Sequence, residues 1–379
     1  MPSTVIEQAL LLYFLDALPA TRFCHLLRSI GSAEHIMQAD RGALRGAGLN
    51  EAQVQAIAQC ESNAEIRQQV DSALAWHDPQ RGRHIVLYSD PHYPALLREI
   101  HDPPPLLFVL GQLQALLCPQ IAMIGSRRCS VDGMRNASRF AQFLASQHFS
   151  VCSGMARGID TCAHEGALRA DGVTVAVLGT GVDVVYPKSN RALSEKIQQR
   201  GALVSELPLG SKAIASHFPK RNRIISGMSA GVIVVEAAIK SGSLITARLA
   251  IEQNRELFAI PGSIRNPLCL GPHRLIQQGA ALIDSPEQVL EQLDSLLGSQ
   301  ISLLRQTTLG AGATKVSLGL TEQLNKEARC VIQAMGYDPV PLEIIVERSA
   351  LPLIKVQTQL LQLELDGHIR HHLGQYVLC

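Results

Sequence analysis

The chain has 379 residues, more than one ordinary hydrophobic core accommodates, so we expect two or three domains. Hydrophobic residues make up 46% and charged residues 18%, which excludes a disordered or fibrous protein. The net charge of +1 excludes a basic coat over the whole molecule, so any surface that binds phosphates must be local.

Cysteine usage and the N-terminus indicate the compartment. The nine cysteines are scattered from Cys24 to Cys379 and never form a C-x-x-C pair, so neither a disulfide framework nor a metal site is predicted. The N-terminus lacks a signal-peptide pattern, and no segment offers the roughly 18 consecutive apolar residues of a membrane span. We therefore expect a cytoplasmic protein that uses no cofactor and does not associate with membranes.

Residues 1–80 are predicted to form a small helical domain. Apolar residues recur at helical spacing over 10–18, and short polar breaks separate the later helical stretches. The segment LRGAGL at 44–49, followed by apolar positions at 52–57, resembles a helix-hairpin-helix, so the domain is expected to be helix-hairpin-helix-like or SAM-like. Such a glycine turn can offer backbone N–H groups to a DNA phosphate, but small helical domains also use it for packing alone.

Residues 84–297 alternate short β-branched apolar runs with amphipathic helical stretches. This pattern is typical of a mostly parallel sheet that is covered by helices on both faces. The expected fold is therefore α/β, a Rossmann-like, doubly wound domain in which helices cross over between the strands. Strands are predicted at 121–124, 149–152, 173–178, 202–205, 232–235, 256–260 and 281–283.

The end of the chain is predicted to be a linker and a small third domain. Residues 298–318 are rich in Gly, Ser, Thr and Ala and have little periodic apolar content, which indicates a linker. Residues 319–379 show three helical stretches and then a strand pair, the order of a winged-helix domain. The third helix of such a domain often reads DNA. Here its polar residues are only Lys355, Gln357, Thr358 and Gln359, so a protein-interaction or vestigial role is an equal alternative.

Glycines, hydroxyls and arginines follow the first two core strands, where open α/β sheets bind ligands. A glycine lets the backbone approach a phosphate, a helix start adds positive potential, and an arginine can pair with phosphate oxygens. The motif IGSR follows the first strand and SGMARGID follows the second, so both are predicted to bind anions. The residues concerned are Gly125, Ser126, Arg127, Ser153, Gly154 and Arg157.

The segment HFPKRNRII at 217–225 is the strongest single indication of nucleic-acid binding. Phe218 is suited to stacking on a base, and the cations after it are suited to backbone phosphates. An arginine-rich helix start that forms internal salt bridges would explain the same residues. After the strand at 232–235, a further glycine turn is predicted to direct N–H groups at an anion. These two segments add Phe218, Lys220, Arg221, Asn222, Arg223, Ser241, Gly242 and Ser243.

Three features of the core suggest an enzyme, but each has a simpler explanation. Asp160 and His164 are four residues apart, yet an aspartate that caps its own helix is commoner than an acid/base pair. The G-x-G at 179–181 lacks the third glycine of a dinucleotide site. Glu236 has no nucleophile or metal cluster beside it in the sequence, so we expect a structural role, such as pairing with Arg223. No catalytic residue is predicted.

The ordered series IGSR, SGMARGID, AVLGTG, FPKRNRII, SGSLITA and FAIPG resembles the DNA-processing protein A (DprA/Smf) family over roughly residues 90–290. The resemblance implies a homodimer that binds and protects incoming single-stranded DNA during natural transformation and helps to load the RecA recombinase. It implies that the strand-end residues named above form the DNA pocket. It also places a dimer or RecA surface near 271–279, with His273, Ile276 and Leu282 as candidates.

Two other functions remain open. Nucleoside-monophosphate phosphoribohydrolases have the same type of fold and a P-G-G-x-G-T-x-x-E loop with a catalytic glutamate, whereas this chain has SGSLIT at 241–246. A regulatory adaptor that acts through the winged helix would depend on residues 320–379 and not on the pocket arginines.

Overall fold

The protein is described by a computed structural model that covers residues 3–293, 326–335, 340–349, 351–365, 369–372 and 375–378. The chain divides into two compact units, Met1–Arg305 and Gln306–Cys379. The linker predicted at 298–318 lies outside the described residues. In the part of the chain that the structure describes, no helix is both long and apolar enough to cross a membrane.

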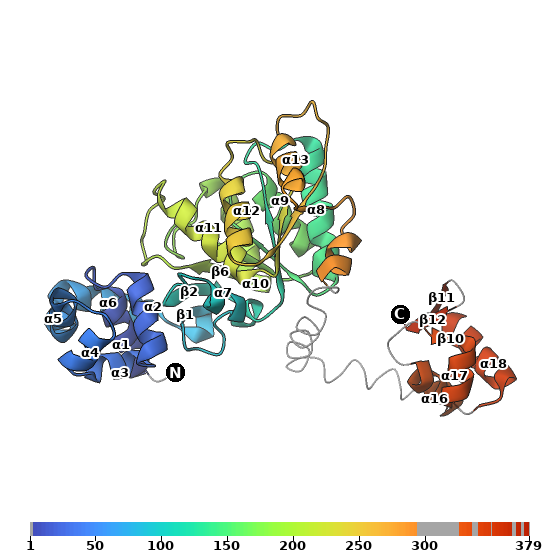
Figure 1. The fold of residues 1–379 in the computed structure, drawn as a ribbon, viewed down its shortest axis with the longest axis horizontal. Coiled ribbons are helices and arrows are strands. Elements are labelled where there is room, and N and C mark those ends of the chain that lie inside the picture. The colour runs from blue at the N-terminus through green and yellow to red at the C-terminus, as the bar shows by residue number, and fades with distance from the viewer. Residues whose placement is uncertain are drawn as a thin grey trace. The chain divides into compact units, whose positions relative to one another are not determined.

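The first unit begins with six short helices (Figure 1). Side chains of Ser32, Asp40, Asn50 and Asn63 accept backbone N–H bonds at the starts of four of them, which explains why these helices begin where they do. The helices are α1 (Ser3–Tyr13), α2 (Ala20–Ser29), α3 (Ala33–Gln38), α4 (Arg41–Gly46), α5 (Glu51–Gln59) and α6 (Ala64–Trp76).

The predicted hairpin lies between α4 and α5. Gly48 has φ of +86° in its turn, a conformation that glycine adopts without strain. The N–H groups of Ala47, Gly48 and Leu49 bond to carbonyls of α4, and Glu51 pairs with arginines of the same hairpin. These donors are used within the protein, so the contacts favour the packing explanation of the glycine turn.

A nine-stranded sheet forms the centre of this unit, with the order β1-β2-β6-β5-β4-β3-β7-β8-β9. Strands β3 to β9 are parallel to one another, whereas β1 and β2 are antiparallel to each other and β2 is antiparallel to β6. All seven predicted strands are present, as β3 (Gln120–Ile124), β4 (Ser150–Ser153), β5 (Thr174–Val177), β6 (Ala202–Ser205), β7 (Gly231–Val234), β8 (Glu256–Ala259) and β9 (Ala281–Leu282). The sequence did not single out β1 (Arg83–Leu87) and β2 (Leu106–Gly111).

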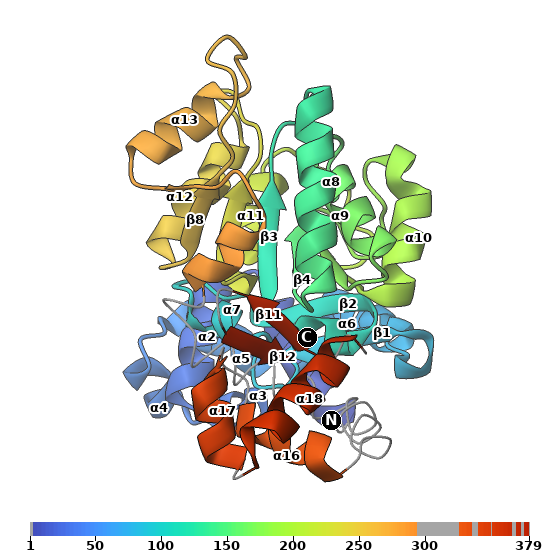
Figure 2. The same cartoon turned by 90° about the vertical axis from the view of Figure 1, so that its right-hand side faces the viewer.

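Helices cover both faces of the sheet, as a doubly wound fold requires. One apolar core joins one face to α8 (Val131–Ser146) and α9 (Ile159–Arg169), and α10 (Arg191–Arg200) packs farther along on that side. Another core joins the opposite face to α7 (Ala95–Glu99), α11 (His217–Met228), α12 (Ser243–Glu252) and α13 (Leu270–Gln277). Figure 2 shows α10 and α13 at opposite ends of the sheet.

The N-terminal helices share their core with the sheet. Their buried leucines form one cluster with side chains of β1, β2 and α10. The rings of Tyr13 and Trp76 lie edge-on against the fully buried Phe108 of β2, with centroids 6.2 and 5.9 Å away. The helical region is therefore packed onto the antiparallel end of the sheet.

The second unit has the helix and strand order of a winged helix, as predicted. A three-stranded antiparallel sheet has the order β10-β12-β11, and buried apolar residues such as Val331, Ile345 and Leu360 fill the core. Its elements are α16 (Lys326–Met335), β10 (Val340–Pro341), α17 (Leu342–Ser349), α18 (Leu353–Leu365), β11 (Ile369–His372) and β12 (Gln375–Leu378).

Candidate nucleic-acid interface

A pocket of about 870 Å³ lies at the carboxyl edge of the parallel strands. Its lining includes the loops that follow β3 and β7, neighbouring strands from which the chain winds in opposite directions. Open α/β sheets bind ligands at this switch point. Nine predicted site residues line it together: Gly125, Ser126, Arg127, Phe218, Arg221, Asn222, Ser241, Gly242 and Ser243.

Hydrogen bonds hold the two loops together. The Ser126 N–H donates to the carbonyl of Glu236 at 2.7 Å, and the Ser243 hydroxyl donates to the carbonyl of Gly125 at 2.9 Å. A Cβ on Gly125 would lie 2.5 Å from Cγ1 of Ile159 and 2.9 Å from the Glu236 carbonyl. The glycine is therefore required by loop packing, a reason that the sequence motif alone did not reveal.

Glu236 has the structural role that we expected, but with a different partner. Its buried carboxylate accepts the N–H of Ser130 at 2.8 Å, the Ser130 hydroxyl at 2.5 Å and the Asn266 side-chain amide at 3.4 Å. The expected pairing with Arg223 is wrong, because the carboxylate instead holds the loop that leads into α8.

An arginine and two aromatic rings form one side of the pocket. The exposed Arg127 guanidinium lies 5.6 Å from the centre of the Phe218 ring, a cation–π distance. The Tyr186 ring is 5.7 Å from that of Phe218, tilted by 49°, and 45% of Tyr186 is exposed. These three side chains present a positive charge and open ring surface to the same space.

The sequence analysis missed Tyr186 as a site residue. It follows the G-x-G loop after β5, which we considered only as a possible dinucleotide site. The signal was the aromatic residue before Pro187, but its approach to Phe218 became visible only in three dimensions. Arg128 and Lys240 also line the pocket without having been predicted.

Arg221 lies at the bottom of the pocket and is only 6% exposed. Its guanidinium donates to the carbonyl of Gly154 at 2.8 Å and to that of Val177, and among the described residues its Nε has no partner. A Cβ on Gly154 would lie 2.4 Å from the guanidinium, so any side chain there would displace Arg221 from its present position. Gly154 and Arg221 were both predicted as site residues and they are adjacent, but Gly154 packs against Arg221 and does not line the cavity.

Asp160 and His164 do not form the acid/base pair that their spacing allowed. The expected helix cap is also wrong, because Asp160 lies within α9 and its carboxylate accepts N–H bonds from Gly154 at 3.1 Å and Ala156 at 3.2 Å in the preceding loop. Burial raises the pKa of Asp160, although the Arg221 charge acts in the other direction. The His164 ring contacts the Thr174 hydroxyl at 2.7 Å, and burial together with Arg221 lowers its pKa to about 3.

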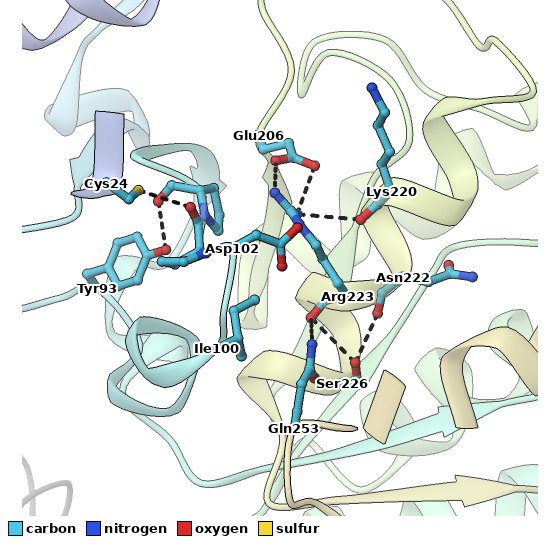
Figure 3. Close-up of polar contacts among 12 residues, drawn as sticks. Cys24, Tyr93, Ile100, Asp102, Glu206, Lys220, Asn222, Arg223, Ser226 and Gln253 are labelled. Carbon is cyan, nitrogen blue, oxygen red and sulfur yellow. Dashed lines mark hydrogen bonds and ion pairs between the residues drawn. The ribbon is translucent and has the colours of Figure 1, made fainter. Parts of the chain in front are cut away.

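Figure 3 shows Arg223 pointing toward the carboxylates of Asp102 and Glu206, and the side chain is not part of the pocket lining. Its Nε donates to Asp102 at 2.7 Å, and its two terminal nitrogens donate to the Glu206 oxygens at 3.0 and 2.6 Å. The side chain is only 11% exposed. This is the internal salt bridge that the sequence left open as an alternative to phosphate binding.

The remaining predicted residues are not part of the pocket lining. The buried Ser153 hydroxyl donates to the Met123 carbonyl at 2.6 Å, whereas Arg157 and Lys220 are exposed. Of the proposed partner-surface residues, His273 and Ile276 are half-buried and Leu282 is exposed.

Residues 84–294 match the model of the DNA recombination-mediator protein A family, and residues 319–375 match the DprA winged helix domain. Protein Smf of Escherichia coli K12 is 42% identical over 312 residues, 82% of this chain and 81% of the relative. The DNA processing protein DprA of Streptococcus pneumoniae R6 is 47% identical over 205 residues, 54% of this chain and 72% of the relative.

Solved structures show the same likeness. The X-ray structure of DprA from Streptococcus pneumoniae superposes with a TM-score of 0.63 at 36% identity, over 75% of this chain and 95% of that chain. A structure on the single-stranded DNA binding mode of DprA from Helicobacter pylori gives a TM-score of 0.50 at 30% identity, over 53% and 92%. This chain therefore belongs to the DNA recombination-mediator protein A (DprA/Smf) family.

Proposed function

We propose that this chain binds single-stranded DNA in the pocket at the β3–β7 switch point. The observation that carries the proposal is the convergence of Arg127, Tyr186 and Phe218, from three separate crossovers, on one cavity. Positive charge beside open aromatic rings is the combination with which proteins bind strands of unrelated sequence. The Helicobacter pylori relative, whose structure concerns single-stranded DNA binding, supports the assignment.

The geometry suggests how the strand is held. Arg127, Arg128 and Lys240 provide charge for backbone phosphates, and the turn at 241–243 begins α12, so the N–H groups of its first turn add positive potential. Unpaired bases can stack on Tyr186 and Phe218, whereas the bases of a duplex are already stacked on each other. We therefore expect a preference for single strands.

We also propose that the chain acts by binding and not by catalysis. Glu236 and Asp160 are occupied by hydrogen bonds that hold loops, which leaves them a structural role. Incubation with a nucleoside monophosphate tests this, because release of the free base would support the phosphoribohydrolase alternative instead.

The wider role is proposed from the family. We propose a cytoplasmic homodimer that protects incoming DNA during transformation and helps to load RecA, with His273, Ile276 and Leu282 at the dimer or RecA surface. The exposed Leu282 fits a contact surface. Light scattering of the full chain and of Leu282→Arg tests the dimer, and RecA assembly on coated strands tests the loading role.

Arg127→Ala is expected to cost about 1 to 3 kcal/mol of affinity for a labelled oligothymidylate, since the variant can no longer form a charge-assisted hydrogen bond to a phosphate. Fluorescence anisotropy at two salt concentrations measures the affinity and its salt dependence. Arg191→Ala on α10, at the other end of the sheet, is the matched control. Unchanged binding by Arg127→Ala would remove the pocket from the proposal. Gel shifts with single- and double-stranded probes test the expected preference for single strands.

A further inference from the structure

A second groove, of about 540 Å³, lies between α12 and α13. Lys240, Arg248 and Arg274 line it, and all three are exposed. Among the residues that the structure describes, its lining contains no aspartate or glutamate, and no ion pair joins these three cations to a carboxylate. The charge of this groove is therefore available to an anionic ligand.

The groove adjoins the pocket. Lys240, Ser241, Gly242 and Ile245 line both cavities, so the turn at the start of α12 is their common wall. Gly242 is exposed, and a Cβ built on it would meet no atom within 4 Å, which shows open space above this turn. A chain that occupies the pocket can therefore cross the turn without a steric barrier at this position.

We propose that the strand held in the pocket crosses the 241–243 turn and continues into the α12–α13 groove, where Arg248 and Arg274 bind its phosphates. The inference rests on the proposed function, since it assigns the path of the same ligand. Ile245 and Ile251 give the groove exposed apolar surface for sugars and bases between the phosphate contacts. The ligand class is thus a polynucleotide strand longer than the pocket accommodates.

This path leaves the proposed partner surface free. The groove takes Arg274 and Gln278 from α13, whereas His273 and Ile276 do not belong to its lining. Because successive helical residues are separated by about 100° around the axis, these two pairs of side chains leave α13 on different sides. One chain can therefore hold the strand in the groove and a protein partner on the other flank of the helix.

The double variant Arg248→Ser/Arg274→Ser in the full chain tests the proposal against labelled oligothymidylates of increasing length. For short probes that only fill the pocket, we expect the affinity of the unaltered protein. For long probes we expect about tenfold weaker binding, and the slope of log affinity against log salt should fall by about 1.4, or ~0.7 for each phosphate that is no longer neutralised. Both arginines are exposed, and thermal unfolding checks that the fold is retained.

The matched control is Arg191→Ser/Arg200→Ser, which removes the same charge from α10 at the far end of the sheet. Equal weakening by the control would show a general charge effect and would overturn the groove. If the double variant keeps the salt slope of the unaltered protein at every probe length, the groove proposal is also overturned. Ile245 and Ile251 would then be better explained as a surface for a protein partner. In either case, the proposed function would still stand if the protein binds short probes and Arg127→Ala does not. If the unaltered protein binds no probe, both the proposed function and the groove proposal are wrong.

Discussion

The loop that follows β3 and the helix α11 both carry arginines, but the side chains have different partners. Arg127, in the loop after β3, is exposed and its guanidinium lies over the Phe218 ring. Arg223 on α11 is held by two carboxylates, and Arg221 donates to backbone carbonyls. We infer from this difference that an arginine near a pocket can bind an anion only when neighbouring groups do not already occupy its donors.

The largest effect is expected for Arg223→Ala. Removing the arginine leaves Glu206, only 15% exposed, without its partner, so we expect a loss of about 3 kcal/mol in the free energy of unfolding. Urea unfolding measures this loss. The salt dependence of strand binding should not change if Arg223 makes no phosphate contact. A lower salt slope at full stability would show that Arg223 faces the DNA after all.

The variant Tyr186→Ala tests whether the aromatic side chains of the pocket stack on bases. Loss of one stacking surface is expected to weaken binding of oligothymidylate by about 1 to 3 kcal/mol, while Tyr186→Phe keeps the ring and the affinity. An abasic strand of equal length provides the control, because it has phosphates but no bases. Equal weakening on both strands would indicate that Tyr186 supports the pocket without stacking on a base.

The smallest effect concerns His164, which is buried and also lies within the influence of the Arg221 charge. Burial and this charge lower the pKa of His164 from 6.5 to about 3. Below pH ~6.5 the unfolded chain therefore binds a proton that the native chain does not, and stability falls as the pH falls. From pH 6 to pH 5 we expect a loss of about 1 kcal/mol in the free energy of unfolding.

Urea unfolding at the two pH values measures this loss, and His164→Gln should remove it. His77 and His84 also have pKa values lowered mainly by burial, so they act in the same direction and remain in the variant. An identical pH dependence in the variant and the unaltered protein would show that His164 does not contribute.

The sequence predicted the centre of the fold well because parallel strands buried on both faces are continuous apolar runs. The strand β2 is also apolar, but it follows three prolines and pairs antiparallel at one end of the sheet, outside the repeating strand–helix pattern. The pocket glycines were predicted as phosphate contacts. For Gly125 and Gly154 the structure shows a different reason for a glycine, close packing against Ile159 and Arg221, and Gly154 does not line the pocket.

The sequence could not show which arginines of α11 form internal salt bridges and which face the pocket. Asp102 lies 121 residues from Arg223 along the chain and Glu206 lies 17 residues from it, so only the folded sheet brings these carboxylates to α11. Tyr186 was missed for the same reason, since its ring meets Phe218 across two different crossovers. The order of the motifs therefore predicted residues that line one pocket, whereas only the folded chain shows which of their side chains are held by other groups.

The shared core of the N-terminal helices and the sheet has a consequence for the integrity of the site. Tyr13 donates to the backbone carbonyl of Glu206 at 2.6 Å, and the side chain of Glu206 holds Arg223 on α11. A chain shortened to begin at β1 would expose Phe108 to water and would free the residue that steadies the helix carrying Phe218 and Asn222. The helical region thus supports the helix that lines the proposed DNA pocket, through Glu206 and Arg223.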